Sequence, residues 1–569
     1  MLSNSLQIMD LTTLKAVLSE LRKEIVPSRF ETAQQPEPQT LQIGLRTLKG
    51  LVWLELSWKA DAARLVRVPS PSRIGSKSTL AKQIQNCLGQ MTLVEIKQKD
   101  FERVVEFNLA LRPGEPIKRS LILELMGRHS NFLLLNEDKQ IITLGRQVRE
   151  SQSRIRPIST GDRYVPPPPL KGIKPNKSET IDSWKRRLCL TPETLKKNLH
   201  SSYQGISPSL SLQLAHEDFE IAIEILNLPV LQISDRRWTM LHKSWCQWLT
   251  QLDEEIFNLS FQGPTPYRVW NSKVLNPSKS SKNLALALGH YYKEGLNKKE
   301  INSLSKKLKK VLDLHLEHEL EALQNQEALL EKTVEGPQLK EEADLILSMP
   351  SLTRDSVLKA QKLYEKAKKL KRSVDRLKNR CKHHKQRIEL IHNSETYLEN
   401  LITNTWETSV DRLQRLKELN MEIDDLLKKS NQSKKHKKNI QNQPNPLEIK
   451  SPAGLLIQIG RNHRQNELIS LRYSKSGDLW FHAQECPGSH VVLKSSTTFP
   501  DEPDLQLAAD LAAYFSRAKA NKKVAVVMTP TQNLQRVNNS APGTVRHRGG
   551  TIRWAQPERA KKYLTSNSP

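Results

Sequence analysis

One short turn of the sequence carries a cation, an imidazole, a hydroxyl and an amide together. Residues 121–135 read LILELMGRHSNFLLL, so two apolar runs of strand length flank Met-Gly-Arg-His-Ser-Asn. Arg128 can bind two phosphate oxygens at once, while His129 and Asn131 can donate hydrogen bonds to sugars or base edges. Gly127 lets the backbone come close to a ligand. The turn could therefore contact RNA, although Asn and Ser also suit a solvated hairpin.

Two further groups of residues suggest related chemistry. Arg103 could contact RNA while the adjacent Glu102 orients it, but taken alone the pair is more simply an ion pair on a solvated face. The sequence Gly205-Ile-Ser-Pro-Ser resembles the hairpin of a helix-hairpin-helix module. In such a hairpin, Gly205, Ile206 and Ser207 would present backbone N–H groups to a phosphate. A plain turn between two helices explains these residues equally well.

The C-terminal part contains a run of hydrogen-bond donors and a run of aromatic residues. The donors follow the apolar stretch LLIQIG and are Arg461, Asn462, Arg464, Gln465 and Asn466. We expect them to contact nucleic acid or a nascent chain. Because neighbours on a strand point to opposite faces, one of Trp480 and Phe481 should be core and the other free to stack on a base. Trp480 and His482 are the candidates for RNA contact.

Residues that could catalyse a reaction or hold a metal do not form a complete set. The sequence Cys381-Lys-His-His384 lacks a fourth ligand at zinc spacing, and His315-Leu-Glu-His318 is not an HExxH motif. No P-loop or GxGxxG sequence precedes a helix, and the five cysteines are far apart. We therefore expect no catalytic residue, no metal and no cofactor, in a protein that is not an enzyme.

The charge balance indicates a polyanionic partner. The 569 residues include 89 Lys and Arg against 61 Asp and Glu, a net charge of +28. An excess of this size is typical of proteins that bind nucleic acid. No run of eighteen or more apolar residues occurs, and residues 1–15 lack the pattern of a signal peptide. We expect a cytoplasmic protein with no membrane partner.

Several regions must position these residues, and together they predict a multidomain α+β fold. Residues 9–170 alternate apolar runs with turns, which predicts antiparallel strands and hairpins, and four consecutive prolines close the region. The runs are LQIGL, LVWLELS, LVRV, RVVEFNLAL, LILEL, FLLL and IITL. Residues 178–295 have helical patterns. Residues 433–450 predict a flexible basic linker, and 451–569 a compact α+β domain.

Residues 296–432 give the clearest periodic pattern. Apolar residues recur at steps of three and four over 301–330 and again over 357–398, which predicts two long amphipathic helices. The sequence Glu335-Gly-Pro337 separates them and should reverse the direction of the backbone. The helices should then pack as an antiparallel coiled-coil hairpin, an arm about 60 Å long at roughly 1.5 Å per residue.

Several motifs resemble those of the RqcH/NEMF family, also called the NFACT family. They are Gln98 to Phe107, Glu124-Leu-Met-Gly-Arg-His-Ser-Asn131, Arg154-Ile-Arg156, Gly161-Asp-Arg-Tyr164, Gly205-Ile-Ser-Pro208, Ala360-Gln361, Gly460 to Asn466, Gly477 to His482 and Cys486 to Val492. They recur in the family's order over nearly the whole sequence. The resemblance implies a glycosylase-N-like α+β N-terminal domain, a helical domain with a helix-hairpin-helix, a coiled-coil arm and an RNA-binding C-terminal domain.

The resemblance also implies a ribosome quality control factor. Such factors bind 50S subunits that hold a stalled peptidyl-tRNA, and bacterial members recruit tRNA, preferentially alanyl-tRNA, for untemplated alanine tailing. A small S4-like RNA-binding protein is a further implied partner. By the same resemblance, Glu124, Leu125 and Met126 belong to the tRNA-facing surface. Glu102 stands where tailing-competent members usually have Asp, and its longer side chain would move the carboxylate by more than about 1 Å, enough to disturb a preorganised contact.

Two other classes of protein stay open. One is a nucleic-acid-processing protein with a degenerate glycosylase-like lobe. DNA glycosylases with such a lobe use an amine nucleophile on a proline after the initiator Met, whereas Leu2 follows Met1 here, and Asp10 follows Met9 if translation starts there. The other is a fibronectin-binding adhesin, a label that some family members carry. The missing signal peptide disfavours the adhesin, and the missing proline disfavours the glycosylase.

Overall fold

The structure is a computed structural model that describes residues 6–71, 78–271, 283–349, 353–403, 406–427, 445–537 and 542–566. The protein forms two compact units, Met1–Leu296 and Asn297–Pro569. Across the described ranges, no helix has the length and apolar character needed to span a membrane.

A nine-stranded antiparallel sheet forms the first half of the N-terminal unit, in the order β4-β3-β2-β1-β5-β6-β7-β8-β9. The strands are β1 (Ser28–Glu37), β2 (Thr40–Thr47), β3 (Gly50–Ser57), β4 (Arg64–Val68), β5 (Thr92–Gln98), β6 (Val104–Ala110), β7 (Arg119–Glu124), β8 (Asn131–Leu135) and β9 (Ile141–Leu144). Helices α1 (Leu11–Ile25) and α2 (Thr79–Leu88) share a core with the sheet. Each predicted apolar run is a strand. β1 has no such run, because its sequence SRFETAQQPE is mostly polar.

Strand β8 is apolar at consecutive positions because both of its faces are covered. Phe132 and Leu134 belong to the main core, whereas Leu133 and Leu135 belong to a second core. Residues 141–165 supply much of that second core. A strand buried on both faces needs apolar side chains throughout rather than at alternate positions. The turn before β8 therefore stands at the end of a rigid strand.

The rest of the N-terminal unit is helical. Its helices are α3 (Ile181–Leu188), α4 (Leu195–Ser202), α5 (Pro208–Ala215), α6 (Phe219–Asn227) and α7 (Asp235–Asp253). Each begins after a Ser, Thr or Asp whose side chain accepts a backbone N–H of the first turn. Trp184, Trp238, Trp245 and Trp248 are all buried in the core that the helices share with the sheet.

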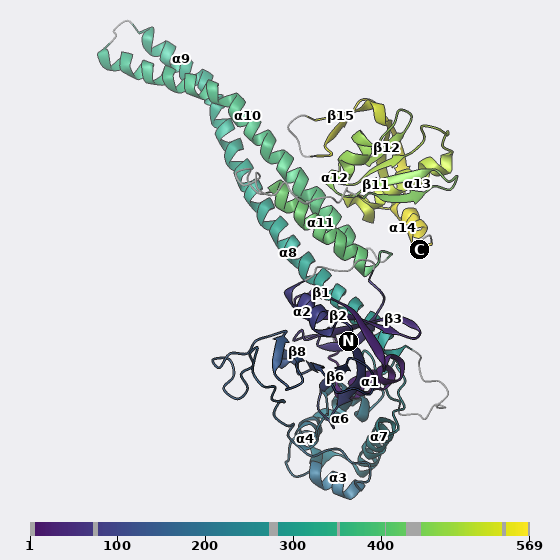
Figure 1. Cartoon of the computed structure of the whole chain (residues 1–569). Helices are drawn as coiled ribbons and strands as arrows, with labels where there is room; N and C mark the ends of the chain where they lie inside the picture. The colour runs from purple at the N-terminus through teal and green to yellow at the C-terminus, as the bar shows by residue number, and fades with distance from the viewer. Residues whose placement is uncertain are drawn as a thin grey trace. The chain divides into compact units, whose positions relative to one another are not determined.

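The arm differs from the prediction at its turn. Helix α8 (Leu284–Glu331) is followed by a single 3-10 turn, η4 (Lys332–Val334), and by α9 (Glu335–Leu347). Gly336 and Pro337 lie in the first turn of α9, where a proline is tolerated because its missing N–H would have no helical partner. The backbone reverses later, between α9 and α10 (Arg354–Thr403) (Figure 1). The prediction of a reversal at 335–337 is therefore wrong.

Side-chain pairs set the antiparallel register of the arm. Nδ1 of His384 lies 2.6 Å from the buried Glu319 carboxylate, and Tyr364 bonds to Asp344 farther out. The next helix, α11 (Ser409–Leu427), was not predicted. It contributes to a core with α8 and α10 that consists of Ile301, Leu308, Leu312, Leu390, Ile391, Tyr397, Leu398, Leu401, Leu413, Leu416, Leu419 and Ile423. The base of the arm is thus a bundle of three helices.

The C-terminal domain contains a six-stranded antiparallel sheet in the order β10-β11-β13-β12-β14-β17. Its strands are β10 (Leu447–Lys450), β11 (Leu456–Gly460), β12 (Leu479–Ala483), β13 (His490–Leu493), β14 (Val524–Pro530) and β17 (Thr551–Ala555), and β15 (Leu534–Arg536) pairs with β16 (Val545–His547). The helices are α12 (His463–Glu467), α13 (Glu502–Tyr514) and α14 (Pro557–Ser566). The predicted linker mostly lies outside the described residues, but its end is wrong, since 447–450 form β10.

Candidate nucleic-acid interface

The exposed part of the predicted turn consists of Arg128 and His129. Residues Gly127–His129 form a 3-10 turn, η1, and Gly127 has a φ of +56°, which glycine adopts without strain. Ser130 closes the turn by accepting a backbone N–H through its Oγ atom at 2.8 Å. Nε of Arg128 donates to Nε2 of His129 at 3.1 Å. Both side chains are open to solvent, as an RNA contact would require.

Asn131 holds a second cation beside this turn. Its Nδ2 atom donates to the Arg146 carbonyl at 2.8 Å, and its Oδ1 atom accepts the Arg146 N–H at 2.9 Å. Nη1 of Arg146 in turn donates to the Arg128 carbonyl at 2.6 Å. The predicted RNA contact by Asn131 is therefore corrected, because its side chain is buried and positions Arg146 instead. The sequence motif did not reveal Arg146, which lies outside it.

Glu124 and Leu125 are interior residues, which corrects their prediction as tRNA-facing. Leu125 lies in the main core. The Glu124 carboxylate is fully buried and accepts from Nη1 of Arg156 at 2.9 Å and from the Tyr164 hydroxyl at 3.0 Å. Burial, with the Glu124 charge, raises the pKa of Tyr164. Glu124 thus fastens residues 141–165 to the sheet, while Met126 beside the turn is half-buried.

Glu102 and Arg103 do not form an ion pair on a solvated face, which is the simpler interpretation of their sequence. Oε1 of Glu102 accepts the backbone N–H of Leu170 at 3.1 Å, at the end of the proline run. Arg103 is half-buried, and this burial lowers the pKa of its guanidinium, opposed by the charges of Asp10 and Glu102. The cation therefore lies in a partly desolvated position between two carboxylates. A phosphate contact there would be stronger than one in open water.

The hairpin Gly205–Ser207 packs against this position. Oγ of Ser207 donates to Oδ2 of Asp10 at 2.7 Å, and Asp10 also accepts the N–H of Thr13 as the cap of α1. Gly205 has a φ of +77°, and a Cβ there would come within 2.9 Å of Phe101. Ile206 packs partly buried against the main core. Three stretches far apart in sequence thus meet around Arg103, and Asp10 was the residue that sequence reasoning missed.

The donor run in the C-terminal domain faces protein rather than solvent. The Arg461 guanidinium is buried and pairs with the buried Glu407 carboxylate at 2.5 Å. Arg464 pairs with Asp425 of α11 at 2.7 Å. Asn462, Gln465 and Asn466 are also buried. The prediction of nucleic-acid contact by this run is therefore corrected, because acidic residues from an earlier part of the sequence neutralise its cations.

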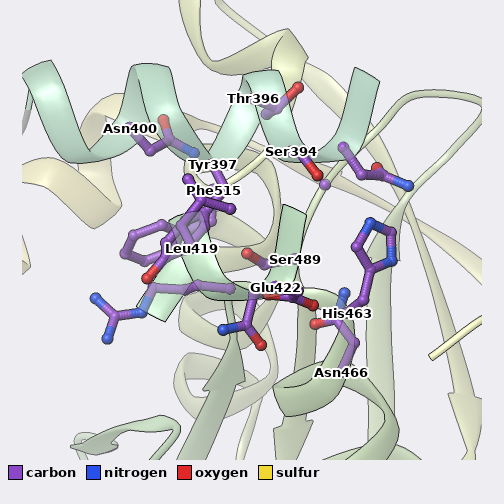
Figure 2. A pocket seen from close by; sticks show the side chains of 14 residues that line it. Ser394, Thr396, Tyr397, Asn400, Leu419, Glu422, His463, Asn466, Ser489 and Phe515 are labelled. Carbon is purple, nitrogen blue, oxygen red and sulfur yellow. The ribbon is translucent and has the colours of Figure 1, made fainter. Parts of the chain in front are cut away.

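A cavity of about 10 Å³ lies where α10 and α11 meet the C-terminal domain, large enough for about one water molecule (Figure 2). Glu422 lines it beside His463, Asn466 and Ser489. Oε1 of Glu422 accepts the N–H of Arg464 at 3.3 Å, while Oε2 is buried with no partner among the described residues. Burial raises the pKa of Glu422 to about 7, although the Arg464 N–H and charge oppose it.

Trp480 and Phe481 are both buried, so the prediction that one would be free is wrong. Phe481 lies in the core with α13, and Trp480 lies in a smaller core with Ile469, Val492, Val527 and Leu534 on the opposite face. The half-buried His482 ring stacks on Trp480, with centroids 5.5 Å apart. Burial lowers the pKa of His482 to about 4, so its imidazole is neutral near pH 7.

Known proteins match both parts of the sequence. Residues 10–356 match the family model of NFACT N-terminal and middle domains, and residues 447–549 match that of the NFACT protein RNA binding domain. The chain is 26% identical over 555 residues to "Rqc2 homolog RqcH" of Streptococcus suis, covering 93% of this chain and 95% of the relative. It is 26% identical over 481 residues to the protein of the same name from Bacillus subtilis, covering 79% and 80%.

A solved structure, the C-terminal part of the fibronectin/fibrinogen-binding protein of Streptococcus suis, is 26% identical with a TM-score of 0.38, covering 46% of this chain and 98% of that one. A TM-score of this size carries no argument, so the family assignment rests on the two family models. One of them spans residues 10–356, more than half of the 569 residues, and the second begins with the first residue of β10. The chain therefore belongs to the NFACT family, the family of the RqcH proteins.

Proposed function

We propose that this protein is a ribosome-associated quality control factor that binds 50S subunits carrying a stalled peptidyl-tRNA and recruits a tRNA to them. The observation that carries the proposal is the meeting of two family motifs, 98–107 and 205–208, with Asp10 around Arg103, in a protein with a net charge of +28. Its membership of the family and its RqcH relatives support the same role. The C-terminal domain, which matches the family's RNA binding domain, would add rRNA contacts.

In this proposal the N-terminal unit grips the tRNA backbone. Arg103 would bind a phosphate from its partly desolvated position, and the exposed Arg128 and Arg146 would bind others. His129 would donate to a sugar or base edge. The residues that would hold these side chains in position are the buried Glu124, Leu125 and Asn131. The hairpin at 205–207 would be the turn of a helix-hairpin-helix module. The nine-stranded sheet would correspond to a glycosylase-like lobe that lacks the nucleophile of the glycosylases.

The protein itself would catalyse no reaction. It would hold tRNA, preferentially alanyl-tRNA, while the subunit transfers alanine to the stalled polypeptide, so the product is an untemplated alanine tail. A small S4-like RNA-binding protein would be a partner in the same complex. No feature of the described residues favours fibronectin binding over this role, since the surface cations described above suit a polyanion.

Co-sedimentation with purified 50S subunits, followed by sequencing of crosslinked RNA, tests the binding. We expect tRNA and large-subunit rRNA in the crosslinks, and affinity that falls steeply between about 50 and 200 mM salt because bound phosphates release counterions. Damaged DNA in the crosslinks would favour a glycosylase-like role instead. Mass spectrometry of the C-termini of stalled polypeptides, with and without the protein, tests the alanine tails.

The arm can be tested separately from the tRNA site. Replacing 324–382 by a short Gly-Ser turn would remove the distal part while keeping the three-helix core and the pair Glu319–His384. We expect weaker 50S binding with unchanged affinity for free tRNA. Loss of both affinities together would contradict a separate role for the arm.

A further inference from the structure

The last strands of the C-terminal domain form a strongly basic edge. Between Asp510 and Glu558 the sequence contains no acidic residue. Its cations over that stretch are Arg517, Lys519, Lys522, Lys523, Arg536, Arg546, Arg548 and Arg553. Within the described ranges, four of them, Lys522, Lys523, Arg546 and Arg548, are exposed and enter no ion pair. A surface of this kind complements a polyanion.

Two large apolar side chains lie uncovered on the same edge. β17 is the outermost strand of the sheet, and there Ile552 is 47% and Trp554 is 65% exposed. Trp554 pairs with Ala525 of β14, and Ile552 pairs with Val527. The neighbouring Ala555 is fully buried in the core with α13. Because side chains alternate along a strand, Ile552 and Trp554 point away from α13.

The same face continues across the sheet through the buried Val527 to half-buried His482. His482 lies opposite Val527, so His482, Val527 and Ile552 form a row over β12, β14 and β17 that spans roughly 10 Å. The exposed His547 ring lies 6.0 Å from Trp480, on which His482 stacks. This side of the sheet therefore carries flat rings at both ends of a short apolar strip.

The unpaired cations border this strip. Lys522 and Lys523 directly precede β14, whose first residue pairs with Ala555 beside Trp554. Arg546 and Arg548 flank His547 at the other end. Flat aromatic faces interleaved with cations suit unpaired nucleotides, because every base has a face to stack and every phosphate a charge to neutralise.

We propose that this face, made of His482, Ile552, Trp554 and the four bordering cations, binds single-stranded RNA with one base stacked on Trp554. The inference rests on the proposed RNA-binding role and assigns that role to a surface. Part of this surface, Trp554 included, lies beyond residues 447–549, which match the RNA binding domain. A protein partner would fit less well, because it would have to supply carboxylates for all four cations within a small area.

Fluorescence anisotropy of a short labelled oligoadenylate RNA with the full-length protein tests the inference. We expect Trp554→Ala to weaken binding about tenfold and Trp554→Phe to keep it within about threefold, because either aromatic ring can stack. Phe499→Ala is the matched control: Phe499 is 97% exposed in the same domain, but the sequence beside it carries the carboxylates Asp501 and Glu502. We expect that variant to bind like the wild type.

The salt dependence separates stacking from charge. Trp554→Ala should lower affinity equally at all salt concentrations, whereas Arg546→Ala with Arg548→Ala should reduce the salt slope by about two. Equal binding by the Trp554→Ala and Phe499→Ala variants would overturn the inference. A wild-type protein that does not bind the RNA would also overturn the inference. If that protein still sedimented with 50S subunits, the proposed function would be unaffected. Loss of 50S binding by Trp554→Ala with unchanged RNA affinity would overturn the inference too, by assigning the face to a protein.

Discussion

Oγ of Ser207 donates a 2.7 Å hydrogen bond to the Asp10 carboxylate, joining residues that are 197 positions apart. The other oxygen of the same carboxylate accepts the Thr13 N–H at 2.9 Å and caps α1. Asp10 is also one of the two charges that oppose the effect of burial on the pKa of Arg103. One carboxylate therefore links the helix start, the hairpin and the cation.

Replacing Asp10 by Ala should remove the cap and the hairpin bond together. We expect the N-terminal unit to lose about 1–3 kcal/mol of unfolding free energy. Urea unfolding followed by circular dichroism measures the change. Asp138→Ala, at an exposed turn position, is the control and should change stability little. Identical midpoints for both variants would show that the hairpin is held in another way.

Arg103→Ala should weaken tRNA binding. A lost charge-assisted contact of roughly 1.5–3 kcal/mol corresponds to about one to two decades in affinity. Filter binding of purified tRNA gives the value, and the exposed Arg112→Ala serves as a charge-matched control. Equal losses in the two variants would indicate a nonspecific charge effect rather than a phosphate contact at Arg103.

Glu102→Asp probes the alanine tailing. The carboxylate would retract from the Leu170 N–H, which it now accepts at 3.1 Å, while its charge near Arg103 stays. We expect tRNA affinity within about threefold of the wild type and tailing equal or improved. Alanine incorporation on purified stalled subunits is the measurement. Tailing abolished by this variant would show that the surface depends on the longer side chain.

Glu124→Ala should be strongly destabilising, because it leaves the Arg156 guanidinium largely buried without its partner. We expect a loss on the order of 3–5 kcal/mol. The double variant with Arg156→Ala should recover part of it. Limited proteolysis within 141–165, compared among the three proteins, reports whether the segment detaches. Unchanged protection in Glu124→Ala would mean that the apolar contacts of Ile141 and Ile158 suffice.

Glu422 should make the arm base and the C-terminal domain sensitive to pH. Its pKa is raised in the folded protein to about 7, so its contribution to stability is complete below about pH 4.5 and is lost as the pH rises toward 7. Glu422→Gln should remove this dependence and stabilise the protein at pH 8 by about 1–3 kcal/mol. Hydrogen exchange of β11 amides measures it. The exposed Glu389→Gln is the control, and equal pH profiles in wild type and Glu422→Gln would contradict the assignment.

Local sequence predicted the elements whose cause is local. Strand β8 could be predicted because burial on both faces requires a continuous apolar run. The arm could be predicted because its apolar residues recur at helical spacing. The reversal at Gly336-Pro337 was predicted wrongly, since a proline in the first turn of a helix disturbs nothing.

The site was harder to predict because its partners are distant in sequence. Arg461 is indistinguishable from a surface cation until Glu407, 54 residues earlier, is placed beside it. Glu124 likewise looks like a surface carboxylate until Arg156 and Tyr164 enclose it. Arg128 and His129 needed no such partner, and their exposure agrees with the turn that surrounds them.

The buried pair of Arg461 and Glu407 bears on how this protein can be divided. A fragment cut within 428–444 would carry Arg461 and His463 without the helices that cover them, exposing a buried cation and the wall of the cavity. A fragment beginning at Asn297 would keep α10, α11 and their shared core. Recombination that transplants the C-terminal domain into another protein would therefore have to carry the base of the arm with it.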